Sequence, residues 1–133
     1  MDHSCTLIVR SYELDTYGHV NNANYLNYLE YARLEFLNDT GFPYDEFRSC
    51  GAGLYVARID IRYLRPAFLN NKLTIRTTSL SWGRVKGTVR QLILRGEEEI
   101  ADARVDFATV NAAGRPSPMP DDVRERWLVT RGV

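Results

Sequence analysis

The stretch ELDTYGHVNNANYLNYLEYAR, residues 13–33, decides the architecture because it changes from a polar loop to a long helical pattern. Asn21 or Asn22 is the expected N-cap, since short polar side chains accept hydrogen bonds from first-turn N–H groups. The apolar positions that follow are spaced by three and four residues, which predicts one buried helical face made of Leu26, Leu29, Ala32 and Phe36. Gly41 and Pro43 are expected to end the helix.

Around this helix the apolar residues mostly alternate with polar ones, which is typical of strands. The expected strands cover residues 5–12, 54–63, 72–82, 84–95 and 99–110. In the second of these, the pattern predicts one face of Tyr55, Ala57, Ile59, Ile61 and Tyr63 and another of Arg58, Asp60 and Arg62. Short turns between strands predict antiparallel neighbours, and residues 116–129 carry a weaker pattern for a short C-terminal helix. An α+β fold with the sheet curled around the helix would bury both apolar faces.

Length and composition limit the possible functions. A chain of 133 residues is expected to form one domain, 1–133. Lys plus Arg and Asp plus Glu number 17 each, so the chain has no net positive charge with which to bind nucleic acid. The two cysteines and two histidines have no metal-ligand spacing, and no apolar run is long enough to span a membrane. Because the first residues do not form a signal peptide, we expect a cytoplasmic protein with reduced thiols.

Asp15 is the leading candidate for a catalytic group. It lies shortly before the helix start, and Gly18 permits a sharp bend that could fold its carboxylate back toward the helix N-terminus. A helix N-terminus offers free N–H groups that can hold the oxyanion of an attacked carbonyl, so an acid beside it suits acyl transfer. The alternative is that Asp15 or Asn21 merely caps the helix. Spacing alone leaves both open.

Other polar residues of this stretch have simpler interpretations. His19 could act as a base, but the chain has no G-x-S-x-G nucleophile motif, so we expect His19 to orient the loop by hydrogen bonding. Glu30 and Arg33 are expected to form a surface pair, with Glu30 kept as a possible active-site group. The tyrosines at this spacing are expected mainly to pack in the core or an interface, with Tyr25 also placed to touch a ligand; they are Tyr25, Tyr28 and Tyr31.

The run VRSYELDTYGHVNNANYLNYLEYARLEFL, residues 9–37, resembles the signature of hotdog-fold acyl-CoA thioesterases of the 4-hydroxybenzoyl-CoA thioesterase type. It is also similar to plant acyl-lipid thioesterases in the pieces YELD and VNNA. The resemblance continues more loosely through LRPAFLNNKLTIRT and ATVNAAGRPSPMPDDV. It implies a five-stranded antiparallel sheet wrapped around the long helix, in a homodimer or homotetramer with each active site between two subunits.

The resemblance also implies a chemistry: hydrolysis of acyl-CoA or acyl-carrier-protein thioesters without a metal or other cofactor. It assigns Asp15 as the catalytic carboxylate and the N–H of Asn22 as the group that polarises the thioester carbonyl. The residues expected around the substrate are Gly18, His19, Val20, Asn21, Tyr25 and Glu30. Strand cations are expected to meet the phosphates of CoA, the pool being Arg58, Arg62, Arg84, Lys86 and Arg90.

Two other functions stay open at this point. One is a non-catalytic module that binds acyl thioesters, against which the presence of Asp15 argues. The other is a hydratase or dehydratase on the same fold, which ranks lower because the motif D-x-N-P-x-H is absent from the sequence.

Overall fold

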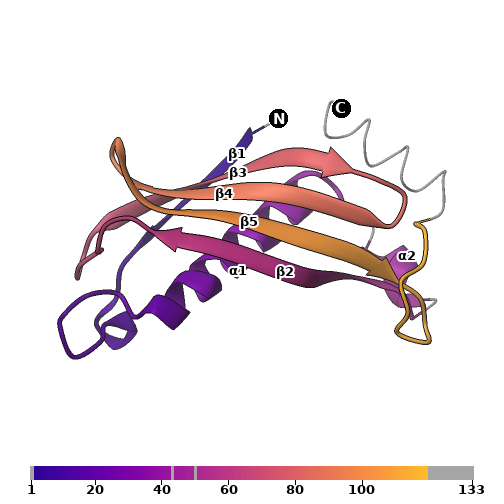
Figure 1. The fold of residues 1–133 in the computed structure, drawn as a ribbon, viewed down its shortest axis with the longest axis horizontal. Coiled ribbons are helices and arrows are strands. Elements are labelled where there is room, and N and C mark those ends of the chain that lie inside the picture. Colours follow the sequence, from indigo (N-terminus) through magenta and orange to yellow (C-terminus); the bar gives the residue numbers. More distant parts are fainter. Residues whose placement is uncertain (1, 43, 50, 120–133) are drawn as a thin grey trace.

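A computed structural model describes residues 2–42, 44–49 and 51–119. It shows an α+β fold in which a curved antiparallel sheet lies over one long helix (Figure 1). The elements are β1 (Asp2–Ile8), a 3-10 turn η1 (Ser11–Glu13), α1 (Asn22–Asp39), α2 (Tyr44–Ser49), β2 (Gly53–Tyr63), β3 (Lys72–Trp82), β4 (Lys86–Arg95) and β5 (Glu98–Val110). The predicted fold class is therefore confirmed. The short helix α2 was not predicted, and the predicted C-terminal helix lies mostly outside the described residues.

The strand order is β1-β3-β4-β5-β2, and every pair is antiparallel. The prediction that strands joined by short connections are neighbours holds for β3, β4 and β5. It is wrong for β2 and β3, because residues 64–71 cross the end of the sheet and place β2 at the far edge. In this connection Asn70 takes the left-handed conformation, with φ of 66°. Both edge strands, β1 and β2, therefore have one neighbour each.

The helix α1 is capped and packed largely as its sequence predicts. The Asn21 side chain accepts a hydrogen bond from the N–H of Ala23 at 2.9 Å, which identifies it as the N-cap. The helix ends before Gly41, whose φ of 73° suits a residue without a Cβ. Its buried face includes Leu29, Ala32, Phe36, Tyr25 and Tyr28. The prediction for Leu26 was wrong: it is 39% exposed, because the core face is rotated toward the tyrosines.

A buried polar network joins the middle of α1 to the sheet. Gln91 of β4 is fully buried; its Nε2 donates to the carbonyl of Leu29 at 3.0 Å and to Thr77 Oγ1 at 3.1 Å. Its Oε1 accepts from Arg33 Nη1 at 3.2 Å. The predicted surface pair of Glu30 and Arg33 is therefore wrong. Arg33 is buried between α1 and the sheet, where it bonds to Gln91, while Glu30 is exposed. Burial lowers the pKa of Arg33.

A β-bulge changes the faces of β2. The pairing of β2 with β5 shifts register between Val56 and Arg58, so Ala57 is the extra residue. One residue of shift exchanges the two faces of a strand. Tyr55 therefore lies opposite Ala108, on the face away from the helix, and not with Ile59 as the alternation predicted.

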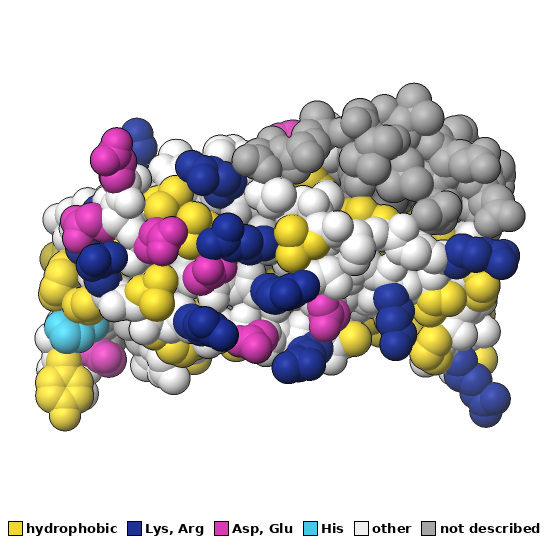
Figure 2. Space-filling view, turned by 45° about the horizontal axis from the view of Figure 1, so that its top comes forward, with side chains coloured by type: hydrophobic (Ala, Val, Ile, Leu, Met, Phe, Trp, Pro, Cys, Tyr) yellow, Lys and Arg dark blue, Asp and Glu magenta, His cyan; other side chains and the backbone are white. Residues whose placement is uncertain are grey.

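The outer face of the sheet carries interleaved charges. Figure 2 shows basic and acidic side chains side by side over this face. Arg90 donates to both carboxylate oxygens of Asp102, at 3.0 and 2.8 Å, and Thr88 donates to Asp106 at 2.8 Å. The charges thus largely compensate one another. Within the described ranges, no helix is long and apolar enough to cross a membrane.

Candidate active site

The loop after η1 is built around Asp15. Its Oδ1 accepts hydrogen bonds from the backbone N–H groups of Tyr17 at 2.8 Å and His19 at 3.1 Å. Its own N–H donates to the carbonyl of His19 at 2.7 Å, and its carbonyl accepts from Gly18 at 3.1 Å. Gly18 has φ of +78°, a conformation that favours glycine. Among the described residues, the hydrogen bonds to this carboxylate reach only Oδ1, which leaves Oδ2 available.

The N-terminus of α1 supplies the donor that the sequence predicts. Since Asn21 is the cap, the capping alternative for Asp15 is wrong. Asn22 is the first helical residue, and a helix leaves this N–H without an intrahelical acceptor. No acceptor for it is found among the residues that the structure describes. A free donor at the positive end of the helix dipole can bind a negative oxygen.

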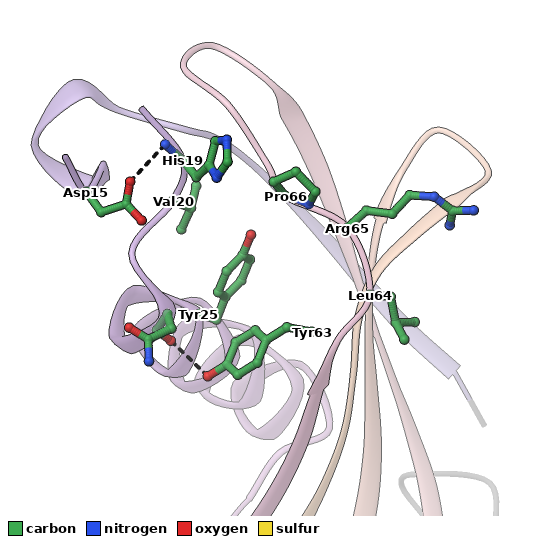
Figure 3. A pocket seen from close by; sticks show the side chains of 9 residues that line it. Asp15, His19, Val20, Tyr25, Tyr63, Leu64, Arg65 and Pro66 are labelled. Atoms are coloured by element: carbon green, nitrogen blue, oxygen red, sulfur yellow. Dashed lines mark hydrogen bonds between the residues drawn. The ribbon is translucent and has the colours of Figure 1, made fainter. Parts of the chain in front are cut away.

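Asp15 and Asn22 line the same pocket, which has a volume of about 390 Å³. Figure 3 shows the carboxylate facing the space between Val20 and α1, with β2 and its following residues on the opposite side. The lining residues are Asp15, His19, Val20, Asn22, Tyr25, Tyr63, Leu64, Arg65 and Pro66. The pocket thus brings together five of the eight residues predicted for the site: Asp15, His19, Val20, Asn22 and Tyr25.

The other three predicted site residues do not line this pocket. Gly18 shapes the loop and Asn21 caps the helix, so both act on the backbone. Glu30 lies further along α1 and is exposed, and it does not line this pocket.

Two tyrosines form the wall between α1 and β2. Tyr25 is buried, its ring lies 5.4 Å from that of Tyr63, and its Oη accepts from the N–H of Ala67 at 3.3 Å. Burial raises the pKa of Tyr25, which keeps its hydroxyl protonated. Tyr63 Oη donates to the carbonyl of Asn22 at 3.0 Å. The prediction that Tyr25 touches a ligand remains compatible with its place in the wall.

Sequence reasoning did not assign the pocket side formed by residues 63–66. Tyr63 is the last residue of β2, and residues 64–66 follow it. Their place opposite Asp15 depends on the crossing of the sheet end by residues 64–71, for which the sequence has no local signal. Arg65 belongs to this group, but Figure 3 shows its side chain pointing away from the pocket; its Nη1 donates to the carbonyl of Glu99 at 3.2 Å, and its Nε lies 3.8 Å from Glu98.

His19 is held mainly through its backbone and its ring. Its ring packs edge-on against Phe68 at 5.1 Å, and the two residues form an isolated β-bridge. Val20 N–H donates to the carbonyl of Ala67 at 2.9 Å, which fastens the same loop to the β2–β3 connection. The expected hydrogen bonding of His19 is observed for its backbone N–H, with Asp15 as the acceptor.

The donor set does not suggest a metal. In the described part of the chain, no three His, Cys, Asp or Glu side chains are grouped so that they could hold a metal ion. The polar groups of the residues that line the pocket include a carboxylate, an imidazole, a helix N-terminus and tyrosine hydroxyls. Such a set can bind a polarised carbonyl and activate a water molecule.

The antiparallel sheet wrapped around a long helix matches the hotdog fold of thioesterases, and Asp15 and the N-terminus of the helix line one pocket in it. Residues 9–127 match the thioesterase-like superfamily. The chain belongs to this superfamily, and its activity is the hydrolysis of thioesters.

Individual relatives agree with this assignment. The chain is 37% identical over 108 residues to the long-chain acyl-CoA thioesterase FadM of Escherichia coli, covering 77% of this chain and 79% of FadM. It is 30% identical over 134 residues to the chloroplastic acyl-acyl carrier protein thioesterase ATL3 of Arabidopsis thaliana, covering 95% of this chain and 67% of the relative. A crystal structure of a probable thioesterase from Bartonella henselae superposes with a TM-score of 0.83 at 32% identity, covering 90% of this chain and all of the other.

Proposed function

We propose that residues 1–133 work as one domain that hydrolyses acyl thioesters of coenzyme A or of acyl carrier protein, with Asp15 as the essential carboxylate. The observation that carries this proposal is the shared pocket of Asp15 and Asn22, with Asp15 Oδ1 fixed by two backbone N–H groups. The loop thus holds one carboxylate oxygen and leaves the other for chemistry.

The proposed reaction begins with the thioester carbonyl oxygen at the N–H of Asn22. As the carbonyl carbon is attacked, its oxygen becomes an anion, and a helix N-terminal donor stabilises that charge more than the neutral carbonyl. Collapse of the tetrahedral intermediate breaks the carbon–sulfur bond. The sulfur leaves as a thiolate and takes up a proton, and the acyl group leaves as the free acid.

Asp15 can promote the attack in two ways. As a general base, it takes a proton from water while the water oxygen bonds to the carbonyl carbon. As a nucleophile, its oxygen bonds to that carbon and forms an anhydride, which water then opens. Single turnover in heavy-oxygen water distinguishes them. General-base attack puts label in the product acid; an anhydride opened at the enzyme carbonyl puts label on Asp15 and leaves the first product unlabelled.

The thiol carrier is to be tested directly, because FadM is named for acyl-CoA and ATL3 for acyl-acyl carrier protein. A panel of acyl-CoA and acyl-carrier-protein thioesters of several chain lengths, with aromatic acyl groups included, should show thiol release for at least one class. A parallel binding assay is the control for a protein that binds without turnover. Binding of the whole panel with no thiol release would refute the proposed function.

The strand cations remain a prediction for binding carrier phosphates. Arg90 is already engaged by Asp102, and Arg58 lies 3.9 Å from Asp60. Arg65, outside the predicted pool, lies beside the pocket with its side chain directed away from it, toward Glu98 and the carbonyl of Glu99. Reversal of the five predicted charges should raise KM for acyl-CoA if they bind phosphate, whereas an unchanged KM would favour Arg65 or a carrier protein.

A homodimer is proposed as the working unit, with a dimer of dimers as the larger alternative, in the cytoplasm. The support is that β2 is an edge strand exposed along much of its length, while the residues just after it line the pocket. Edge strands of this length need a covering partner. Sedimentation at micromolar concentration should show a dimer or larger; a monomer that hydrolyses thioesters at full rate would refute the need for two chains.

A further inference from the structure

A second carboxylate, Glu13, lies two residues before Asp15 and is only 5% exposed. Its Oε1 accepts from the backbone N–H of Arg10 at 2.8 Å and from Tyr28 Oη at 2.9 Å. Its Oε2 accepts from Arg10 Nη2 at 2.6 Å and Nε at 3.1 Å. Burial raises the pKa of Glu13, but the hydrogen bonds from Arg10 and Tyr28 outweigh burial and lower it. Glu13 is therefore ionised in the folded protein at neutral pH.

Glu13 is not placed to react with the substrate. It does not line the pocket that Asp15 shares with Asn22. It lines a different cavity, of about 650 Å³, between β1 and the first half of α1, together with Tyr28 and Arg10. A role in hydrolysis must therefore act through neighbouring residues.

Glu13 connects the catalytic loop to three successive points on α1. Its backbone carbonyl accepts from the N–H of Asn21, the N-cap, at 2.9 Å. The same carbonyl accepts from Asn24 Nδ2 in the first turn at 3.0 Å, and the carboxylate accepts from Tyr28 in the second turn. Tyr28 is 2% exposed, so its hydroxyl is fixed by the core. The Glu13 side chain therefore has a rigid reference point on the helix.

The loop that follows is closed on itself. Asp15 bonds to the backbone of Tyr17, Gly18 and His19, so these residues move as one unit. The orientation of this unit relative to α1 is set where it joins other elements. On one side the attachment is Glu13, and on the other it is the bond of Val20 N–H to Ala67.

We propose that Glu13 is a positioning residue that, through Tyr28, holds the Asp15 carboxylate at its working place against the N–H of Asn22. The inference rests on the proposed function. Loss of this contact moves the loop and leaves in place the opposite wall of the pocket, which Tyr25 and residues 63–66 form. Small misplacements of a reacting group lower the rate by up to about 100-fold. The effect should therefore fall on kcat and not on KM.

The test compares Tyr28→Phe and Glu13→Ala, each of which removes the contact between the two side chains, with the wild type, using the acyl thioester that the panel identifies. Tyr28→Phe keeps the buried ring and removes only the hydroxyl, so the core remains filled even if Glu13→Ala folds poorly. We expect kcat to fall about 10- to 100-fold in each, with KM within about twofold. The double variant should lose little more than either single one, because both act through the same contact.

Asp39→Asn is the matched control. Asp39 Oδ2 lies 2.7 Å from His3 Nε2 and ties the other end of α1 to β1, far from the pocket along the helix. This variant should change melting temperature without changing kcat. Asp15→Asn is run in the same assay. Wild-type kcat in Tyr28→Phe and Glu13→Ala, with activity lost in Asp15→Asn, overturns the positioning role alone. Wild-type activity in Asp15→Asn overturns the proposed function and the positioning role with it.

Discussion

Replacing Asp15 by asparagine separates the structural work of this side chain from its chemical work. The structural work is done by Oδ1, which accepts from the N–H groups of Tyr17 and His19. An asparagine has an oxygen at the same place and can keep both bonds. It cannot accept a proton from water or attack a carbonyl as an anion. The fold should therefore persist while hydrolysis is lost.

The expected magnitudes differ enough to be measured apart. Because both backbone bonds remain, the change in the free energy of unfolding should be below about 1 kcal/mol. A positioned acid or base contributes about 10²- to 10⁴-fold in rate, which corresponds to about 3–5 kcal/mol in the activation free energy. Asp15→Ala, which loses both bonds as well, should lose the same activity and destabilise the protein by about 1–3 kcal/mol.

The assay is thiol release under saturating acyl thioester, with thermal unfolding of each variant measured in parallel. Asp15→Asn with a wild-type melting temperature and strongly reduced kcat is the expected result. The reasoning is refuted if Asp15→Asn hydrolyses the thioester at the wild-type rate, because the second carboxylate oxygen would then have no chemical role.

The remaining predictions concern stability. Asn21→Ala removes the cap bond to Ala23 and should lower the free energy of unfolding by about 1 kcal/mol in chemical denaturation, whereas Asn21→Asp should not. Gln91→Leu leaves the buried guanidinium of Arg33 without its acceptor and should destabilise by about 3 kcal/mol; a loss below about 1 kcal/mol would show that Arg33 is not held there. The pKa of Glu13 is lowered on folding, so the stability that it contributes is complete above its unfolded pKa and is lost as pH falls through the folded pKa. The gap in unfolding free energy between wild type and Glu13→Gln should therefore shrink below about pH 4.3, and a gap that grew on acidification would contradict the assignment.

Features with a local cause could be predicted from the sequence. The range 72–82 of β3 is the predicted one, and Asn21 caps α1 as expected, because alternation and capping involve residues a few positions apart. The core face of α1 was only partly predicted. Tyr25 packs in the core, as expected for it, and its hydroxyl bonds to Ala67, 42 residues away, whereas Leu26 is exposed.

Features with a distant cause could not be predicted. Arg33 can be buried because Gln91, 58 residues later in the chain, accepts its hydrogen bond. The helical pattern alone does not contain this partner, and it therefore predicts a surface pair with Glu30. The bulge at Ala57 has no glycine or proline to mark it, yet it moves Tyr55 to the other face. Tyr63 enters the pocket because β2 pairs with β5 and not with β3. In each case the deciding partner lies on another strand.

The crossing of the sheet end between β2 and β3 also sets the order in which the protein can fold. β1 pairs with β3, with Asp2 opposite Thr78, so the first strand finds its neighbour only after α1, β2 and the crossing have been made. The loop of Asp15 is fastened at Ala67, which lies in that same crossing. Pairings across such long stretches of chain slow folding, typically to milliseconds or seconds. During synthesis, β1 and α1 therefore leave the ribosome before β3 exists, and the catalytic loop cannot be fastened before Ala67 is available.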